Sequence, residues 1–150
     1  MMSNDYRNIL VAIDLSEESH LVLQRAKEIA ARNQQAKLSV VHTLEPLGFA
    51  YGGDIPMDLT SIQEQLDQHA RQRLDELLKD FAIPEENRHI LVGMPDSETH
   101  RLAEENQVDL IVVGSHGRHG LQLLLGSVSS GVLHGAPCDV LAVRVGKKKA

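Results

Sequence analysis

Five short apolar runs, separated by segments with a helical pattern, constrain the fold of this 150-residue chain more than any other feature. Near-continuous apolar runs of this kind are typical of parallel strands that are buried on both faces. Strands that alternate with helices predict an open α/β sheet, doubly wound, with helices on both faces. The five predicted strands are Asn8–Ile13, Leu38–His42, His89–Val92, Val108–Val113 and Asp139–Val145.

Helical signals lie between these strands. Ser16 is predicted to cap the first helix, with Glu17 and Glu18 in its first turn, where carboxylates suit the helix dipole. The apolar face of this helix is predicted to consist of Leu21, Leu23, Ala26, Ile29 and Ala30. Further helices are predicted over Leu59–Phe81, Ser97–Glu105 and Ser127–His134.

Length and composition predict one globular domain over residues 1–150, with a core at about 6–145 and a basic tail at 146–150. The net charge of −6 makes nucleic acid and anionic membranes poor partners. The one cysteine, Cys138, excludes an internal disulfide and is predicted to be a buried, inert thiol. Neither a leader pattern nor an apolar run of membrane length is recognised, so we expect a cytoplasmic protein.

A glycine-rich segment follows the fourth predicted strand and leads to a Gly126-Ser127 pair at the start of a predicted helix. Glycines let bare N–H groups approach a ligand, and a helix N-terminus favours anions. This order of strand, glycine loop and helix indicates a phosphate-binding segment. The alternative stays open that the glycines only make a turn and that Ser127 only caps the helix.

Asp14 and Gly114 follow the first and the fourth predicted strands. In open α/β sheets, ligands bind beyond the carboxyl ends of the strands, where the strand order reverses. If the order is 3-2-1-4-5, that point lies between these two residues, and a carboxylate facing a glycine segment suits a nucleotide. Asp14 has an equally simple alternative role, which is to organise the turn into the first helix.

Signals of catalysis are missing. The Walker pattern, a G-x-G-x-x-G after a strand and a G-x-S-x-G elbow are absent. His116 and His119 have no Cys or carboxylate cluster beside them and are interpreted as loop histidines, and His42 as a packed, hydrogen-bonded residue at a strand end. We predict no catalytic residue and no metal site in the protein.

Four segments match one known family in order and spacing. They are Ile9 to Ser16, Val40 to His42, Asp109 to Gly114, and the ending from Gly126 to Val143. With these segments the chain resembles the universal stress protein family along nearly its whole length. The resemblance implies a five-stranded, Rossmann-like fold in the order 3-2-1-4-5, a cytoplasmic stress-response role and homodimers that pair their last strands.

One branch of this family binds ATP through a pattern like G-x2-G-x9-G-[ST], with an aspartate after the first strand. Carried over to this chain, Asp14 would meet the ribose or a metal, and Thr43 would lie beside the adenine. The implied ligand is ATP or AMP with Mg²⁺. The candidate cofactor-binding residues are Ala12, Asp14, Thr43, Gly114, Gly117, Gly126, Ser127, Val128 and Ser129.

The spacing departs from that pattern, because eight residues rather than nine separate Gly117 from Gly126. The shorter spacing resembles the A-type branch, whose members do not bind ATP. An A-type protein would act through protein partners. The aromatic residues Phe49 and Tyr51 offer a surface for such a partner, with the alternative that they simply close the crevice. A third hypothesis is a slow ATPase or a self-modifying phosphotransferase acting at Ser127 or Ser129.

The last predicted strand is suited to pairing with a second copy. It is an apolar edge strand without proline, and such edges tend to pair with another strand. The short lysine tail that follows is a poor cover for this edge. We expect a homodimer that pairs through Val140, Ala142, Val143 and Val145.

Overall fold

The computed structural model describes residues 5–45, 59–114 and 136–144. Within these ranges, five parallel strands form one sheet in the order β3-β2-β1-β4-β5, which confirms the predicted fold class and strand order. The strands are β1 (Asn8–Ala12), β2 (Lys37–Leu44), β3 (Arg88–Val92), β4 (Leu110–Gly114) and β5 (Asp139–Val143).

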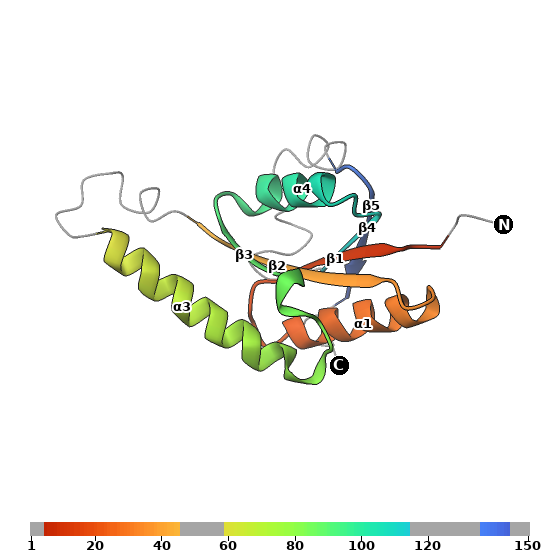
Figure 1. Cartoon of the computed structure of the whole chain (residues 1–150), viewed down its shortest axis with the longest axis horizontal. Helices are drawn as coiled ribbons and strands as arrows, with labels where there is room; N and C mark the ends of the chain where they lie inside the picture. Colours follow the sequence, from red (N-terminus) through yellow and green to blue (C-terminus); the bar gives the residue numbers. More distant parts are fainter. Residues whose placement is uncertain (1–4, 46–58, 115–135, 145–150) are drawn as a thin grey trace, which may run out of the picture.

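Helices cover both faces of the sheet. Helices α1 (Ser19–Arg32) and α3 (Leu59–Leu77) lie on one face, and α4 (Pro95–Glu105) lies on the other (Figure 1). Two short 3₁₀ helices, η1 (Leu78–Asp80) and η2 (Glu85–Asn87), connect α3 to β3. None of the described helices is both long and apolar enough to cross a membrane.

The hydrophobic core has two layers because successive strand residues point to opposite faces. In β1, Ile9 and Val11 pack under α1 and α3, whereas Leu10 and Ala12 pack toward the α4 side. All four side chains are at most 6% exposed. Burial on both faces explains why the strand has a continuous apolar sequence rather than an alternating one.

The prediction for the start of the first helix is wrong. Helix α1 begins at Ser19, its N-cap is Glu18, and no side chain caps it. Ser16 lies in the preceding turn instead, where its carbonyl accepts a hydrogen bond from the Ser19 N–H. Leu21 is 53% exposed and does not belong to the apolar face, because Val22, Ala26 and Ala30 follow one another at four-residue spacing along the buried side.

Other boundaries move by a few residues. Strand β2 continues to Leu44, so Thr43 lies inside the strand rather than after it. The predicted helix that ends at Phe81 changes into a 3₁₀ turn at Leu78, and α4 begins at Pro95, a residue suited to the first helical position. The predicted helix over Ser127–His134 and the aromatic residues Phe49 and Tyr51 lie outside the described residues.

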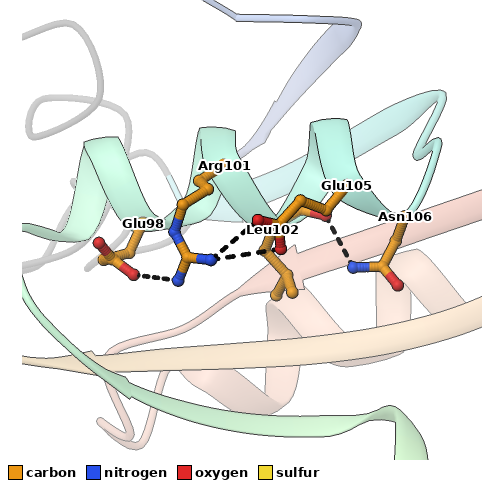
Figure 2. A network of polar contacts seen from close by, with 5 residues as sticks. All are labelled: Glu98, Arg101, Leu102, Glu105 and Asn106. Carbon is orange, nitrogen blue, oxygen red and sulfur yellow. Dashed lines mark hydrogen bonds and ion pairs between the residues drawn. The ribbon is translucent and has the colours of Figure 1, made fainter.

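Helix α4 is held on its exposed side by a small polar network, shown in Figure 2. Arg101 pairs with Glu98 one turn before it and with Glu105 one turn after it. At the end of the helix, the Asn106 side chain donates to the Leu102 carbonyl at 2.9 Å. These contacts fix a helix that covers the α4 side of the sheet, and exposed pairs of this kind contribute only modestly to stability.

Candidate functional site

The candidate site lies where the strand order reverses, at the carboxyl ends of β1 and β4. These two strands pair in parallel from Ile9–Leu110 to Val11–Val112, so both end at the same edge of the sheet. Ala12 is the last residue of β1, and Gly114 is the last residue of β4. The strand order reverses between these two strands, and this is the point at which open α/β sheets bind their ligands.

Asp14 lies in the turn directly after β1, and its side chain is half-buried. Its Oδ1 atom accepts hydrogen bonds from the Ser16 N–H at 3.0 Å and from the Ser19 hydroxyl at 3.2 Å. Asp14 therefore does organise the turn into the first helix, as one of its two predicted roles requires. Sequence reasoning missed Ser19, which is 2% exposed, although a serine five residues after Asp14 can reach its carboxylate.

The carbonyl groups on both sides of Asp14 are also bonded to other elements. The His42 Nδ1 atom, on β2, lies 2.9 Å from the Ile13 carbonyl oxygen, and the Arg73 Nε, on α3, donates to the Leu15 carbonyl at 3.3 Å. The interpretation of His42 as a packed, hydrogen-bonded residue is confirmed, since it is 7% exposed. Arg73 was missed because nothing in the helical pattern links it to a turn 58 residues away.

The other described candidates are more deeply buried than Asp14. Ala12 is 6% exposed, Thr43 is 3% exposed and Gly114 is buried at the end of β4. Among these four residues, Asp14 is thus the one whose side chain reaches the surface of the edge. The remaining predicted residues, Gly117, Gly126, Ser127, Val128 and Ser129, lie outside the described residues.

The described carboxylates at this edge favour a hydroxyl or a cation over a bare phosphate, whereas the Arg73 guanidinium, bonded to the Leu15 carbonyl, is a positive charge beside them. The exposed Glu45 follows β2, so two carboxylates stand after neighbouring strands. Like charges repel a phosphate, whereas a carboxylate accepts hydrogen bonds from ribose hydroxyls or binds Mg²⁺. In the described ranges, no three His, Cys, Asp or Glu side chains gather into a metal site.

A separate cavity of about 470 Å³ lies at the opposite end of the sheet. Its lining combines the second half of α1, the first residues of β2 and the connection between α3 and β3, and it includes Lys27, Ala30, Leu38, Phe81 and Asn87. The Lys27 ammonium already stands 5.6 Å from the centre of the Phe81 ring. This cavity has no residue in common with the candidate site.

Cys138 lies just before β5 and is half-buried rather than fully buried as predicted. Burial, with smaller contributions from the neighbouring carboxylates of Asp109 and Asp139, raises the pKa of the Cys138 thiol to about 11. The thiolate is the reactive form, so this pKa agrees with the prediction that the thiol is inert.

The fold defines a class, the doubly wound α/β proteins, and comparison with known proteins assigns the family within it. The model of the universal stress protein family matches residues 5–144, and the chain belongs to this family. It is similar to universal stress protein A homolog 1 of Coxiella burnetii, with 46% identity over 140 residues that cover 92% of this chain and 96% of the relative.

Solved structures agree with this assignment. The chain is similar to hypothetical protein MJ0577, with 25% identity, a TM-score of 0.72 and coverage of 96% of this chain and 99% of the other. It is also similar to a universal stress protein solved in complex with cAMP, with 27% identity, a TM-score of 0.58 and coverage of 94% and 98%. The second structure holds a cyclic adenine nucleotide.

Proposed function

We propose that this universal stress protein is a regulatory module that binds an adenine nucleotide, ATP or AMP, at the carboxyl ends of β1 and β4. The observation that carries the proposal is the position of Asp14, a half-buried carboxylate directly after β1 at the point where the strand order reverses. The cAMP complex of a 27% identical relative supports the ligand class. Ligands of open α/β sheets bind at this point.

The residues present at this edge fit a nucleotide in one orientation. A carboxylate at Asp14 can accept a hydrogen bond from a ribose hydroxyl, which is neutral and is not repelled. The triphosphate needs N–H donors or a cation, so we assign it to the Gly114 side of the crevice and to Mg²⁺. Gly114 is the last residue of β4, where the chain leads into the glycine-rich segment.

We also propose that the site binds rather than catalyses. The His42 Nδ1 bonds to the Ile13 carbonyl, and the Asp14 Oδ1 holds the following turn. A general base must be able to reach the proton that it removes, but the His42 ring is only 7% exposed, and Asp14 already accepts two hydrogen bonds within the turn. A turnover assay with ATP and Mg²⁺ tests this part of the proposal, which predicts no phosphate release above background.

The binding proposal is tested with freshly purified protein. Mass spectrometry of the denatured protein should detect ATP or AMP, and calorimetry of the nucleotide-free protein with ATP and Mg²⁺ should give saturable binding. Asp14→Asn should weaken this binding by up to about tenfold, since the ribose hydroxyl then donates to a neutral oxygen in place of a charged one. Asp67→Asn, which removes an equal charge from an exposed pair with Arg71, is the matched control and should leave the affinity unchanged.

A second candidate function has its own support. The 46% identical relative is named as a homolog of universal stress protein A, and the spacing of eight residues between Gly117 and Gly126 resembles the A-type branch. In this function the protein binds no nucleotide and acts through protein partners. Absence of saturable binding by ATP, AMP and cAMP would favour it over the first proposal.

We further propose that the protein is a homodimer that pairs through β5. This strand lies at the edge of the sheet, and its residues Val140 to Val143 are partly buried rather than fully buried. An apolar edge strand can continue its sheet into a second copy through main-chain hydrogen bonds. Sedimentation at a series of concentrations tests the proposal, and a monomer throughout the micromolar range would contradict it.

We propose that the protein is located in the cytoplasm. The support is the cysteine usage, since a chain whose one cysteine is Cys138 has no internal disulfide and fits a reducing compartment. Fractionation of cells that express a tagged chain should recover it with cytoplasmic markers, and recovery from the secreted fraction would contradict the proposal.

A further inference from the structure

The turn that carries Asp14 is held from outside by two side chains that come from other elements. His42 on β2 bonds to the carbonyl of Ile13, and Arg73 on α3 bonds to the carbonyl of Leu15. These two carbonyls belong to the residues directly before and directly after Asp14. The backbone of Asp14 is therefore fixed on both sides, in addition to the local hydrogen bonds of its carboxylate.

The chemistry of the first contact sets the protonation of the histidine ring. A carbonyl oxygen only accepts hydrogen bonds, so the Nδ1 atom of His42 must carry a proton at its 2.9 Å distance from the Ile13 oxygen. Because the ring is 7% exposed, burial holds it in this orientation. His42 is therefore a fixed donor to the end of β1.

The turn also has a conformation that needs such support. Leu15 has a φ of 65°, in the left-handed region that is disfavoured for residues with a Cβ atom. Strained backbone of this kind persists where the surroundings hold it, and it is concentrated at functional sites. The Arg73 bond to the Leu15 carbonyl acts on this strained residue directly.

We propose that His42 and Arg73 are positioning residues of the nucleotide site, which hold the backbone around Asp14 so that its carboxylate is ordered before the ligand arrives. This inference rests on the proposed nucleotide binding. A site that is ordered in advance loses less conformational entropy on binding and so binds more tightly. Neither residue needs to touch the ligand to act in this way.

The donor requirement gives a sharp test with paired variants of His42. The amide nitrogen of asparagine can replace Nδ1, whereas leucine fills similar space without a donor. His42→Leu should raise the Kd for ATP about tenfold, and His42→Asn should remain within about threefold of the unchanged protein. His89→Leu, at a partly buried histidine of β3, is the matched control and should leave Kd unchanged.

Arg73 provides an independent test if His42→Leu does not fold. Its side chain belongs to a partly buried position of α3, and the bond to Leu15 is long at 3.3 Å. Arg73→Met should therefore raise the Kd for ATP by a smaller factor, about threefold. Equal affinities of His42→Leu and His42→Asn, or unchanged affinity in Arg73→Met, would overturn the proposal.

A second measurement separates this inference from the proposed function. If the unchanged protein does not bind ATP, the proposed function is wrong. The effect of His42 on the order of the Asp14 turn can still be measured in the ligand-free protein. Hydrogen exchange of the Ser16 amide, which donates to Asp14, should be about tenfold faster in His42→Leu and unchanged in His42→Asn. Equal exchange in the two variants would overturn the positioning role regardless of the ligand.

Discussion

Replacing Asp14 with alanine or with asparagine separates its role in the turn from its role toward a ligand. Alanine removes both hydrogen bonds of Oδ1, to the Ser16 N–H at 3.0 Å and to the Ser19 hydroxyl at 3.2 Å. Asparagine keeps an oxygen at the same position and removes only the charge. The two variants therefore differ in the turn but not in the loss of the carboxylate.

The expected loss of stability follows from these contacts. Each bond contributes about 1 kcal/mol to stability. This is below the usual contribution of a hydrogen bond to a charged acceptor, because Asp14 is half-exposed. The Ser19 hydroxyl is 2% exposed, and leaving it without its acceptor adds about 1 kcal/mol. Asp14→Ala should thus cost about 2–3 kcal/mol, or about 5–10 °C in Tm for a chain of this size, and Asp14→Asn about 0.5–1 kcal/mol.

Urea unfolding followed by circular dichroism measures these differences, with Ser19→Ala as the third variant. Ser19→Ala should cost about 1 kcal/mol. Its combination with Asp14→Ala should cost about 2 kcal/mol less than the sum, because both changes remove the same bond and the double variant has no unpaired Ser19 hydroxyl. Strict additivity, or an Asp14→Asn variant as unstable as Asp14→Ala, would refute the assignment of these bonds to the turn.

Three further predictions concern stability and reactivity. Burial lowers the pKa of both His89 and His100, so the unfolded chain takes up protons first as the pH falls below about 6.5. The free energy of unfolding should therefore decrease as the pH falls below that value, until the pH passes the pKa values of the two histidines in the folded protein. In a His89→Gln/His100→Gln double variant, the urea midpoint should decrease less over the same pH range than in the unchanged protein. Gly93→Ala should lower the free energy of unfolding, measured by calorimetry, by about 1–3 kcal/mol, because Gly93 has a φ of +154° and an added Cβ would lie 2.7 Å from the Glu98 Cγ. Adding Glu98→Ala should recover part of this stability. If it recovers none, the steric cause is excluded. Cys138, with a pKa of about 11, should react with a disulfide reagent at neutral pH far more slowly than free cysteine does, and equal rates would contradict the effect of burial.

The sheet could be predicted from the sequence because burial on both faces leaves a local signature. Every described strand overlaps a predicted apolar run, and the strand order agrees. The start of α1 could not be predicted in the same way. Ser16 has the residue type of a helix cap, but its N–H is bonded to Asp14, and the helix begins three residues later. The Ser16 carbonyl accepts from the Ser19 N–H, so Ser16 belongs to a turn before the helix, which its residue type does not reveal.

In the candidate site too, residues could be predicted where the signal is local in the sequence and not where it depends on distant packing. Asp14 and Gly114 could be placed because each lies at the carboxyl end of a strand, and parallel strands bring these ends to one edge. Arg73 could not be placed, because its contact with Leu15 depends on how α3 packs across the sheet, and no sequence period encodes that packing. His42 was correctly interpreted as hydrogen-bonded, but its partner was not identified.

These contacts bear on the two predicted roles of Asp14. The sequence presents them as alternatives, a ligand residue or a residue that organises the turn. In the structure, Oδ1 holds the turn while His42 and Arg73 hold the neighbouring carbonyls, which is more support than a simple helix entry requires. A strained turn held by side chains from β2 and α3 has a cost in stability that packing alone does not explain. The proposed ordering of a carboxylate for a ligand would explain it, so the role in the turn is compatible with the proposed binding role.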